Sequence, residues 1–163
     1  ARGHAVCTVD EVLRGWCARE GRTPHPHEQM GIAIEQARAV EQAPPGWVVA
    51  DTTPLMTAVY SHMLFGDDSL YPMALAHQAL YDSTLVTGID LPWVADGLQR
   101  DGPQVRGPID ALVRASLQRV GGAWSVIAGS GDRRAGRSTR GRPAGPRHPD
   151  DRPARSAAAK PPT

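Results

Sequence analysis

Residues 47–51, with the sequence WVVAD, decide the fold class of this 163-residue chain. An uninterrupted apolar run is typical of a β-strand covered on both faces, which occurs mainly in parallel sheets. Thr84–Ile89 (TLVTGI) is a second run of this kind. Between the two runs, residues Pro54–Phe65 predict a helix that ends at Gly66, and Pro72–Tyr81 predicts another. Strand, helix and strand in this order predict a parallel sheet with helices on both faces.

The same alternation extends in both directions from this centre. On the N-terminal side, the sequence predicts a strand over His4–Val9 and helices over Asp10–Glu20 and His27–Gln42. On the C-terminal side, it predicts a helix over Pro108–Val120 and a last strand over Trp124–Ala128. The expected fold class is α/β, a parallel sheet flanked by helices in three layers.

Composition divides the chain into two parts. Residues 1–131 contain 9 Arg and 14 acidic residues, a net charge of −5, whereas residues 132–163 contain 8 Arg, 1 Lys and 3 Asp, a net charge of +6. Alanines are the only hydrophobic residues of the second part, so burial cannot offset its ordering entropy. We expect one α/β domain in 1–131 and a disordered Arg/Pro/Ala-rich tail in 132–163. The tail either contacts phosphates weakly, as in nucleic acid, or has no binding role.

Several classes of protein are excluded. No window approaches the ~18 uninterrupted apolar residues of a membrane span, and without a charged-then-apolar stretch before a cleavage site in this sequence, secretion is not expected. Cys7 and Cys17 are too few to form a disulfide scaffold, and both are expected to be small buried residues. The segment His25-Pro26-His27 is expected to be a loop without a third metal ligand nearby. A cytoplasmic location follows as the expectation, and the oligomeric state stays open.

Acidic residues follow three of the predicted strands: Asp10-Glu11, Asp51 and Asp90. Ligands of open parallel sheets bind beyond the carboxyl ends of the strands, so these side chains predict a site for Mg²⁺, a hydroxyl group or a ribose. Two alternatives stay open. Any strand that leaves a core ends in something polar, and Asp51 is also a candidate N-cap of the next helix, a role that Thr52 or Thr53 could fill.

The segment Asp90–Gly102 (DLPWVADGLQRDG) carries a second set of candidate residues. Trp93 directly follows the strand end and Pro92, where its ring can lie at the rim of the site. Arg100 and Arg106 lie in a stretch without an apolar face, as suits a loop that clamps phosphates. The alternatives are a core aromatic and solvated arginines.

These motifs together resemble the ribosylnicotinamide-kinase-like family of AAA-type P-loop ATPases, which includes the C-terminal domain of the NAD-biosynthesis regulator NadR. That family has a Glu followed three residues later by Arg, an Ile/Ala-rich helix with a Gln, an Asp-Thr at a strand end, and an acid-hydrophobic-Pro-Trp-x-x-Asp-Gly segment. The resemblance covers about residues 6–128. The matching residues are Glu11, Arg14, Gln36, Asp51, Thr52, Asp90, Pro92, Trp93, Asp96 and Gly97.

The resemblance implies an ATP-dependent nucleoside kinase of the nicotinamide riboside type, with ATP and Mg²⁺ as cofactors. Glu11 would act as base or orienter of the substrate hydroxyl, and Asp51 would bind that hydroxyl or Mg²⁺-bound water. Trp93 would stack on the base. The resemblance also implies that Asp96 holds Arg100 or a ribose, and that Arg14 lies beside Glu11 at the substrate. Arg100 and Arg106 would belong to a lid. Tyr60 would line the nucleoside pocket or, alternatively, only pack in the core.

One feature departs from this family. The sequence has no GxxxxGK[ST] motif, and its only lysine is Lys160. A P-loop needs that motif, because its amides and its lysine hold the phosphates. We expect the first strand, the P-loop and the first helix to lie upstream, and this chain alone to bind ATP poorly and to expose apolar strand edges. The alternatives are a relative that never had a P-loop, and a nucleotide-sensing module that binds without turnover.

Overall fold

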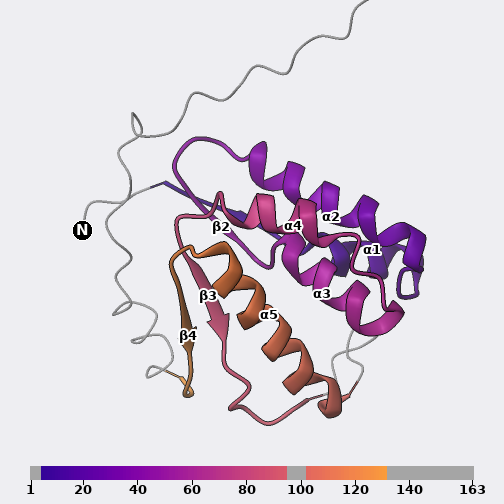
Figure 1. The fold of residues 1–163 in the computed structure, drawn as a ribbon. Coiled ribbons are helices and arrows are strands. Elements are labelled where there is room, and N and C mark those ends of the chain that lie inside the picture. Colours follow the sequence, from indigo (N-terminus) through magenta and orange to yellow (C-terminus); the bar gives the residue numbers. More distant parts are fainter. Residues whose placement is uncertain (1–4, 95–101, 132–163) are drawn as a thin grey trace, which may run out of the picture.

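The computed structural model describes residues 5–94 and 102–131 (Figure 1). Its elements follow the α/β order expected from the sequence. They are β1 (Val6–Val9), α1 (Val12–Glu20), α2 (Pro26–Glu41), β2 (Trp47–Ala50), α3 (Pro54–Phe65), α4 (Tyr71–Gln78), β3 (Thr84–Thr87), a 3₁₀ turn η2 (Pro103–Val105), α5 (Arg106–Val120) and β4 (Trp124–Ile127). Residues 132–163, for which a disordered tail was expected, lie outside the described residues.

The strands form two parallel pairs and not one continuous sheet. β1 pairs with β2 from Val6 opposite Trp47 onward, and β3 pairs with β4 from Thr84 opposite Trp124 onward. Within residues 5–94 and 102–131, no strand joins the two pairs. The α/β class with helix-flanked parallel strands is confirmed, whereas the sheet is divided.

Local chemistry explains where the helices begin and end. α1, α3 and α5 end at Gly21, Gly66 and Gly121, each with a positive φ near 70° that favours glycine. α2 begins at Pro26, because a helix's first residue needs no amide donor. α2 therefore begins one residue before His27, where the helix was expected, and the expectation of a loop was wrong for Pro26.

α3 is the central element of the core. Its Leu55 and Val59 pack against Ile109 and Val113 of α5, and Val86 and Trp124 of the second strand pair border this cluster. Its Ala58 packs in a second cluster with Ala33 of α2, and with Leu70 and Ala74 at and within α4. Both clusters depend on α3, so this helix connects the α2 side of the molecule to the β3–β4 pair (Figure 1).

A polar chain also ties the region after β2 to β3. The Thr53 hydroxyl donates to the buried Gln78 Oε1 at 2.8 Å, and Gln78 Nε2 donates to the Thr84 hydroxyl at 2.8 Å. One amide side chain therefore holds the start of α3, the end of α4 and the start of β3 together.

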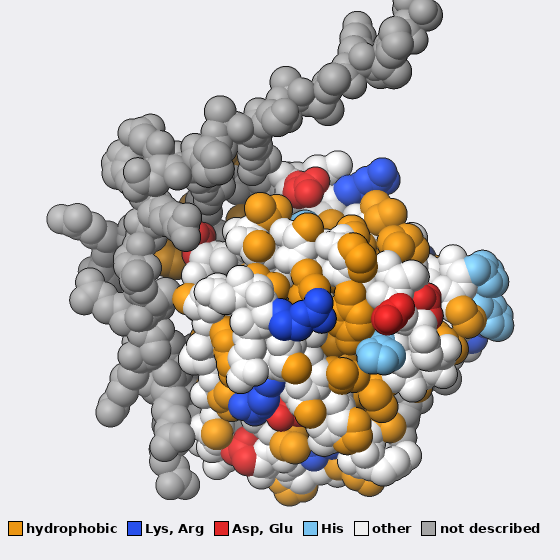
Figure 2. All heavy atoms as spheres, in the orientation of Figure 1, with side chains coloured by type: hydrophobic (Ala, Val, Ile, Leu, Met, Phe, Trp, Pro, Cys, Tyr) orange, Lys and Arg blue, Asp and Glu red, His pale blue; other side chains and the backbone are white. Residues whose placement is uncertain are grey.

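β2 is less buried than its sequence predicts. Val49 is 55% exposed and Trp47 49%, so the expectation of a strand covered on both faces was wrong. Trp47 and Val49 project from the same face of β2, and among the described elements β2 packs closely only against β1, so no helix covers this face. Cys17 is buried as expected, whereas Cys7 of β1 is only half-buried. The helical side of the molecule differs from exposed β2, because Figure 2 shows hydrophobic side chains there interspersed with single charged ones.

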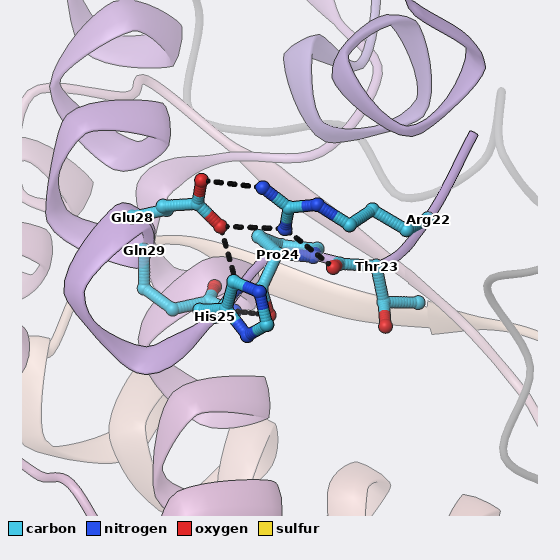
Figure 3. Close-up of polar contacts among 6 residues, drawn as sticks. All are labelled: Arg22, Thr23, Pro24, His25, Glu28 and Gln29. Carbon is cyan, nitrogen blue, oxygen red and sulfur yellow. Dashed lines mark hydrogen bonds and ion pairs between the residues drawn. The ribbon is translucent and has the colours of Figure 1, made fainter. Parts of the chain in front are cut away.

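An ion pair fixes the start of α2 (Figure 3). Both Arg22 terminal nitrogens donate to the Glu28 carboxylate at 2.8 Å, and the His25 amide donates to Glu28 Oε2 at 2.7 Å. These bonds lower the pKa of Glu28 to about 2, the Arg22 side chain being the largest cause. The Arg22 guanidinium also lies 4.8 Å from the Trp16 ring centroid, so the pair connects α1 to α2.

No helix within the described part of the chain is long and apolar enough to cross a membrane.

Candidate functional site

The carboxyl ends of β1 and β2 meet at one edge. The Asp51 amide donates to the Val9 carbonyl at 2.8 Å, which continues the β1–β2 ladder by one residue. Asp10 and Glu11 follow Val9 directly, so the acidic residues after the two strands share this edge. Glu11 and Asp51 therefore follow two strands that are neighbours in the structure.

The turn that carries Asp10 and Glu11 is held by Gln36, which is only 2% exposed. Gln36 Oε1 accepts from the Val12 amide at 2.8 Å, and Gln36 Nε2 donates to the Asp10 carbonyl at 3.3 Å. The glutamine stands on the apolar face of α2, between Ala33 and Ala37. A buried amide on an apolar stripe must have partners. That rule is the signal from which its positioning role could have been inferred.

Asp51 is exposed and is not the N-cap of α3. Thr53 is the cap, because its hydroxyl accepts from the Leu55 amide at 3.3 Å. Thr52 between them has φ of +65°, an uncommon conformation for a threonine. The capping alternative for Asp51 was therefore wrong, and the Asp51 carboxylate makes no ion pair or hydrogen bond with any residue that the structure describes.

Glu11 and Arg14 form an ion pair one helical turn apart. Arg14 Nε lies 3.3 Å from Glu11 Oε2, and the Glu11 side chain is 16% exposed against 56% for Arg14. Glu11 also stands at the N-cap position of α1 with extended backbone. The pair places a positive charge beside the Glu11 carboxylate.

The second strand pair has a separate polar end. Asp90 Oδ2 accepts from the Gly129 amide at 2.6 Å, and the Gly88 amide donates to the Ile127 carbonyl at 2.8 Å. A side chain at Gly88 would meet Asp90 Oδ1 at 2.8 Å, so a residue without Cβ fits here. Asp90 thus joins the ends of β3 and β4. It belongs to this second end and not to the β1–β2 edge.

Two candidates of the segment after β3 are described by the structure. Arg106 is the first residue of α5, and its Nη1 donates to the Leu91 carbonyl at 2.9 Å. In this arrangement it holds the segment after Asp90. Trp93 is half-buried in the same segment. Asp96 and Arg100 lie outside the described residues, so the expectations for them are unchanged.

Tyr60 lies on α3 against the cluster of Leu55, Val59, Ile109, Val113 and Leu117. This position fits the packing alternative that the sequence left open for it.

The cofactors expected from the resemblance differ in how well they fit. Glu11 and Asp51 offer carboxylate oxygens, the ligand type that Mg²⁺ prefers, but residues 5–94 and 102–131 contain no group of three or more possible metal ligands. A triphosphate needs a glycine-rich cradle and a lysine, and the described residues contain no lysine. The ATP phosphates therefore do not fit the residues that the structure describes.

Parallel strands, flanking helices and polar groups at the strand ends define an α/β domain of the nucleotide-binding class. A family model described as an AAA domain matches residues 1–134, and the chain belongs to this family. This membership makes it a P-loop NTPase-like domain with a small-molecule nucleotide as the general partner. No curated protein matches the chain.

Proposed function

We propose that this chain supplies the nucleoside-binding part of an ATP-dependent nucleoside kinase of the nicotinamide riboside type, and that it has no turnover by itself. The observation that carries the proposal is the β1–β2 edge, where Glu11 and Asp51 follow two strands joined by the Asp51–Val9 hydrogen bond. Kinases of hydroxyl groups need a carboxylate that orients the hydroxyl, and this edge offers two.

Each residue has a distinct role in this proposal. Glu11, which pairs with Arg14, accepts the proton of the ribose hydroxyl. Asp51, which has no partner within the described part of the chain, accepts a hydrogen bond from the same ribose. Trp93 stacks on the cationic nicotinamide ring, a cation–π contact of ~0.5–2 kcal/mol.

The phosphoryl group in such a reaction comes from ATP with Mg²⁺. Since the triphosphate does not fit the described residues, we assign no residue of this chain to it. Arg100 and Arg106 stay candidates for a lid over the phosphates, and Asp96 for a partner of Arg100 or the ribose. For Arg106, this role would require it to leave the Leu91 carbonyl.

A nucleotide-sensing module without turnover is the second candidate. The absence of a lysine from residues 1–131 favours it, because a site without the P-loop lysine can bind a nucleotide weakly without activating a phosphate.

Calorimetric titration of the full chain with nicotinamide riboside, ATP and adenosine tests the proposal. We expect the riboside to bind more tightly than ATP, and Asp51→Asn to weaken riboside binding about 10-fold through the loss of a charged hydrogen bond. The control is Asp82→Asn, since Asp82 is also exposed but precedes β3 at the other end of that strand. ATP binding without riboside binding would favour the sensing module, and an unaltered Asp51→Asn affinity would remove Asp51 from the site.

A further inference from the structure

His77, in the last turn of α4, is buried against α2. The residue is 7% exposed, and the Ala37 carbonyl and the Glu41 carboxylate of α2 face its ring. Figure 1 shows α4 alongside α2, and Ala33 of α2 packs in one cluster with Ala74 of α4. The imidazole is therefore part of the contact between these two helices.

The polar atoms around this contact lack partners. The Tyr81 ring lies edge-on to the His77 ring, with 5.4 Å between the ring centroids. Both ring nitrogens of His77 and the Tyr81 hydroxyl are buried, and none of the three makes a hydrogen bond with any residue that the structure describes. Protonation would give His77 a second N–H donor and a positive charge. A buried charge without a partner is strongly unfavourable, so the closed arrangement accommodates only the neutral ring.

The titratable groups that face His77 do not remove this cost. Glu41 attracts a protonated imidazole, but it lies at the exposed end of α2, and burial is the larger effect, which lowers the pKa of His77 below 6.5. Burial also raises the pKa of Tyr81 to about 12, so Tyr81 stays uncharged at neutral and acidic pH. A protonated His77 therefore gains water or Glu41 as a partner only when it leaves its buried position.

The backbone at His77 leads directly to a residue that connects three elements. Gln78 follows it, and its side chain bonds Thr53 before α3 and Thr84 at the start of β3. The Leu80 amide donates to the His77 carbonyl at 3.0 Å, which closes the end of α4. Movement of His77 out of the contact with α2 consequently displaces the turn that carries Gln78.

We propose that His77 is a pH-sensitive switch, which holds the last turn of α4 against α2 as a neutral ring and releases this turn, with Gln78, when it takes up a proton. Among the described histidines, His25 and His27 are exposed and His62 lies 3.2 Å from the Tyr71 hydroxyl. His77 alone of these four is buried without a partner. The proposal depends on the contact between α2 and α4 and is independent of nucleoside binding.

Amide hydrogen exchange on the full chain at about pH 7.5 and about pH 5.5 tests this inference, with protection factors corrected for the intrinsic exchange rates. The buried ring stabilises the closed turn above pH 6.5, and this stabilisation is lost as the pH falls below that value. We expect the Ala79 and Leu80 amides to lose protection up to about 10-fold at the lower pH, because a released imidazole is there about 10-fold more protonated than neutral.

Two other amides serve as internal controls for this measurement. The Gly66 and Gly121 amides donate at the ends of α3 and α5, so their protection should not change between the two pH values. Unchanged protection of Ala79 and Leu80, or an equal loss at all four amides, would overturn the proposal.

His77→Phe keeps an aromatic ring in the contact but cannot take up a proton. We expect the pH dependence of Ala79 and Leu80 protection to disappear in this variant, and circular dichroism confirms that it folds. The matched control is His27→Phe, since His27 is an exposed histidine in the first turn of α2; it should keep the full pH dependence. A pH dependence that persists in His77→Phe would assign the switch to another group and refute the proposal.

NMR titration of the wild-type chain gives a measurement that needs no variant. The His77 ring should titrate with a midpoint below 6.5, and the side-chain amide signals of Gln78 should shift with the same midpoint as its bonds to Thr53 and Thr84 break. A midpoint at or above 6.5, or Gln78 signals that do not follow the titration of His77, would contradict the switch.

Discussion

Gln36 shows how a single buried side chain positions a candidate site. Its amide reaches from α2 to the turn after β1 and bonds both the Asp10 carbonyl and the Val12 amide. Glu11 lies between these two residues, so the position of its carboxylate depends on a side chain that need not contact the ligand.

Replacing Gln36 by leucine should affect both stability and binding. The Val12 amide would lose its partner, and a part-buried donor without a partner costs about 1–3 kcal/mol. We expect a lower urea midpoint and weaker nicotinamide riboside binding. Gln29→Leu is the matched control, because Gln29 is equally buried on α2 but donates only to the Pro24 carbonyl. Gln29 Oε1 is buried without a partner, so the control should change the urea midpoint less than Gln36→Leu does and should leave riboside affinity unchanged. An equal loss of affinity in both variants would contradict the positioning role of Gln36.

For individual residues, the sequence predicted which ones follow the strands but not the backbone and side-chain conformations of those residues. Apolar runs that end in acids locate Glu11 and Asp51. The positive φ of Thr52 has no such signal, since glycine or asparagine is the usual residue there. The bond from Arg106 to Leu91 was also not predictable, because it joins residues 15 positions apart through a segment without periodicity.

Among the helices, α2 has a start that is held by a hydrogen-bonded ion pair. Glu28 accepts from both Arg22 and the His25 amide, and the carboxylate must be ionised to do so (Figure 3). Its pKa is lowered from 4.5 to about 2. A carboxylate whose pKa is lowered in the folded state stabilises the fold at pH values above its ordinary pKa. This stabilisation is lost as the pH falls from about 4.5 toward 2.

Arg22→Gln should raise the Glu28 pKa toward 4.5, because the largest cause of the shift is removed while the His25 amide remains. NMR titration of the Glu28 carboxyl carbon measures the change directly. We also expect the urea midpoint of the variant to vary less with pH between 2 and 4.5. Arg19→Gln is the control, since Arg19 is exposed and its side chain makes no described ion pair with Glu28. If Glu28 of the wild-type protein titrated near 4.5, the pairing with Arg22 would be refuted.

Element positions were largely predictable because their signals are local. Pro54 and Gly66 define α3 as expected, and WVVA forms β2. Pro26 was assigned to a loop because proline occurs both in loops and at the first position of helices. The pair Arg22–Glu28 at this helix start joins residues six positions apart, a spacing outside the helical periodicity on which the prediction was based.

The whole molecule is two strand pairs joined by α3 and α4. The sequence predicted parallel strands because their apolar runs alternate with helices, but which strands are neighbours depends on contacts between distant residues. Burial of β2 was predicted from its composition alone. That prediction was wrong because coverage is a property of the assembled sheet.

Ala58→Leu tests whether α3 connects the two sides. Ala58 is fully buried between α2 and α4, and extra methylenes in a packed core cost about 1–3 kcal/mol. We expect a lower urea midpoint, with β3 and α2 losing exchange protection together. Ala111→Leu is the control, since Ala111 is on the exposed side of α5. Loss of protection in α2 alone would show that the two sides unfold independently.

The Thr53–Gln78–Thr84 chain has a mechanical consequence. Thr53 lies two residues after Asp51, and both threonines bond opposite ends of the same amide group. Sliding β3 along its own axis would stretch both bonds at once and would pull on the backbone next to Asp51. The start of β3 is therefore linked through two hydrogen bonds to the backbone that leads from Asp51 into α3.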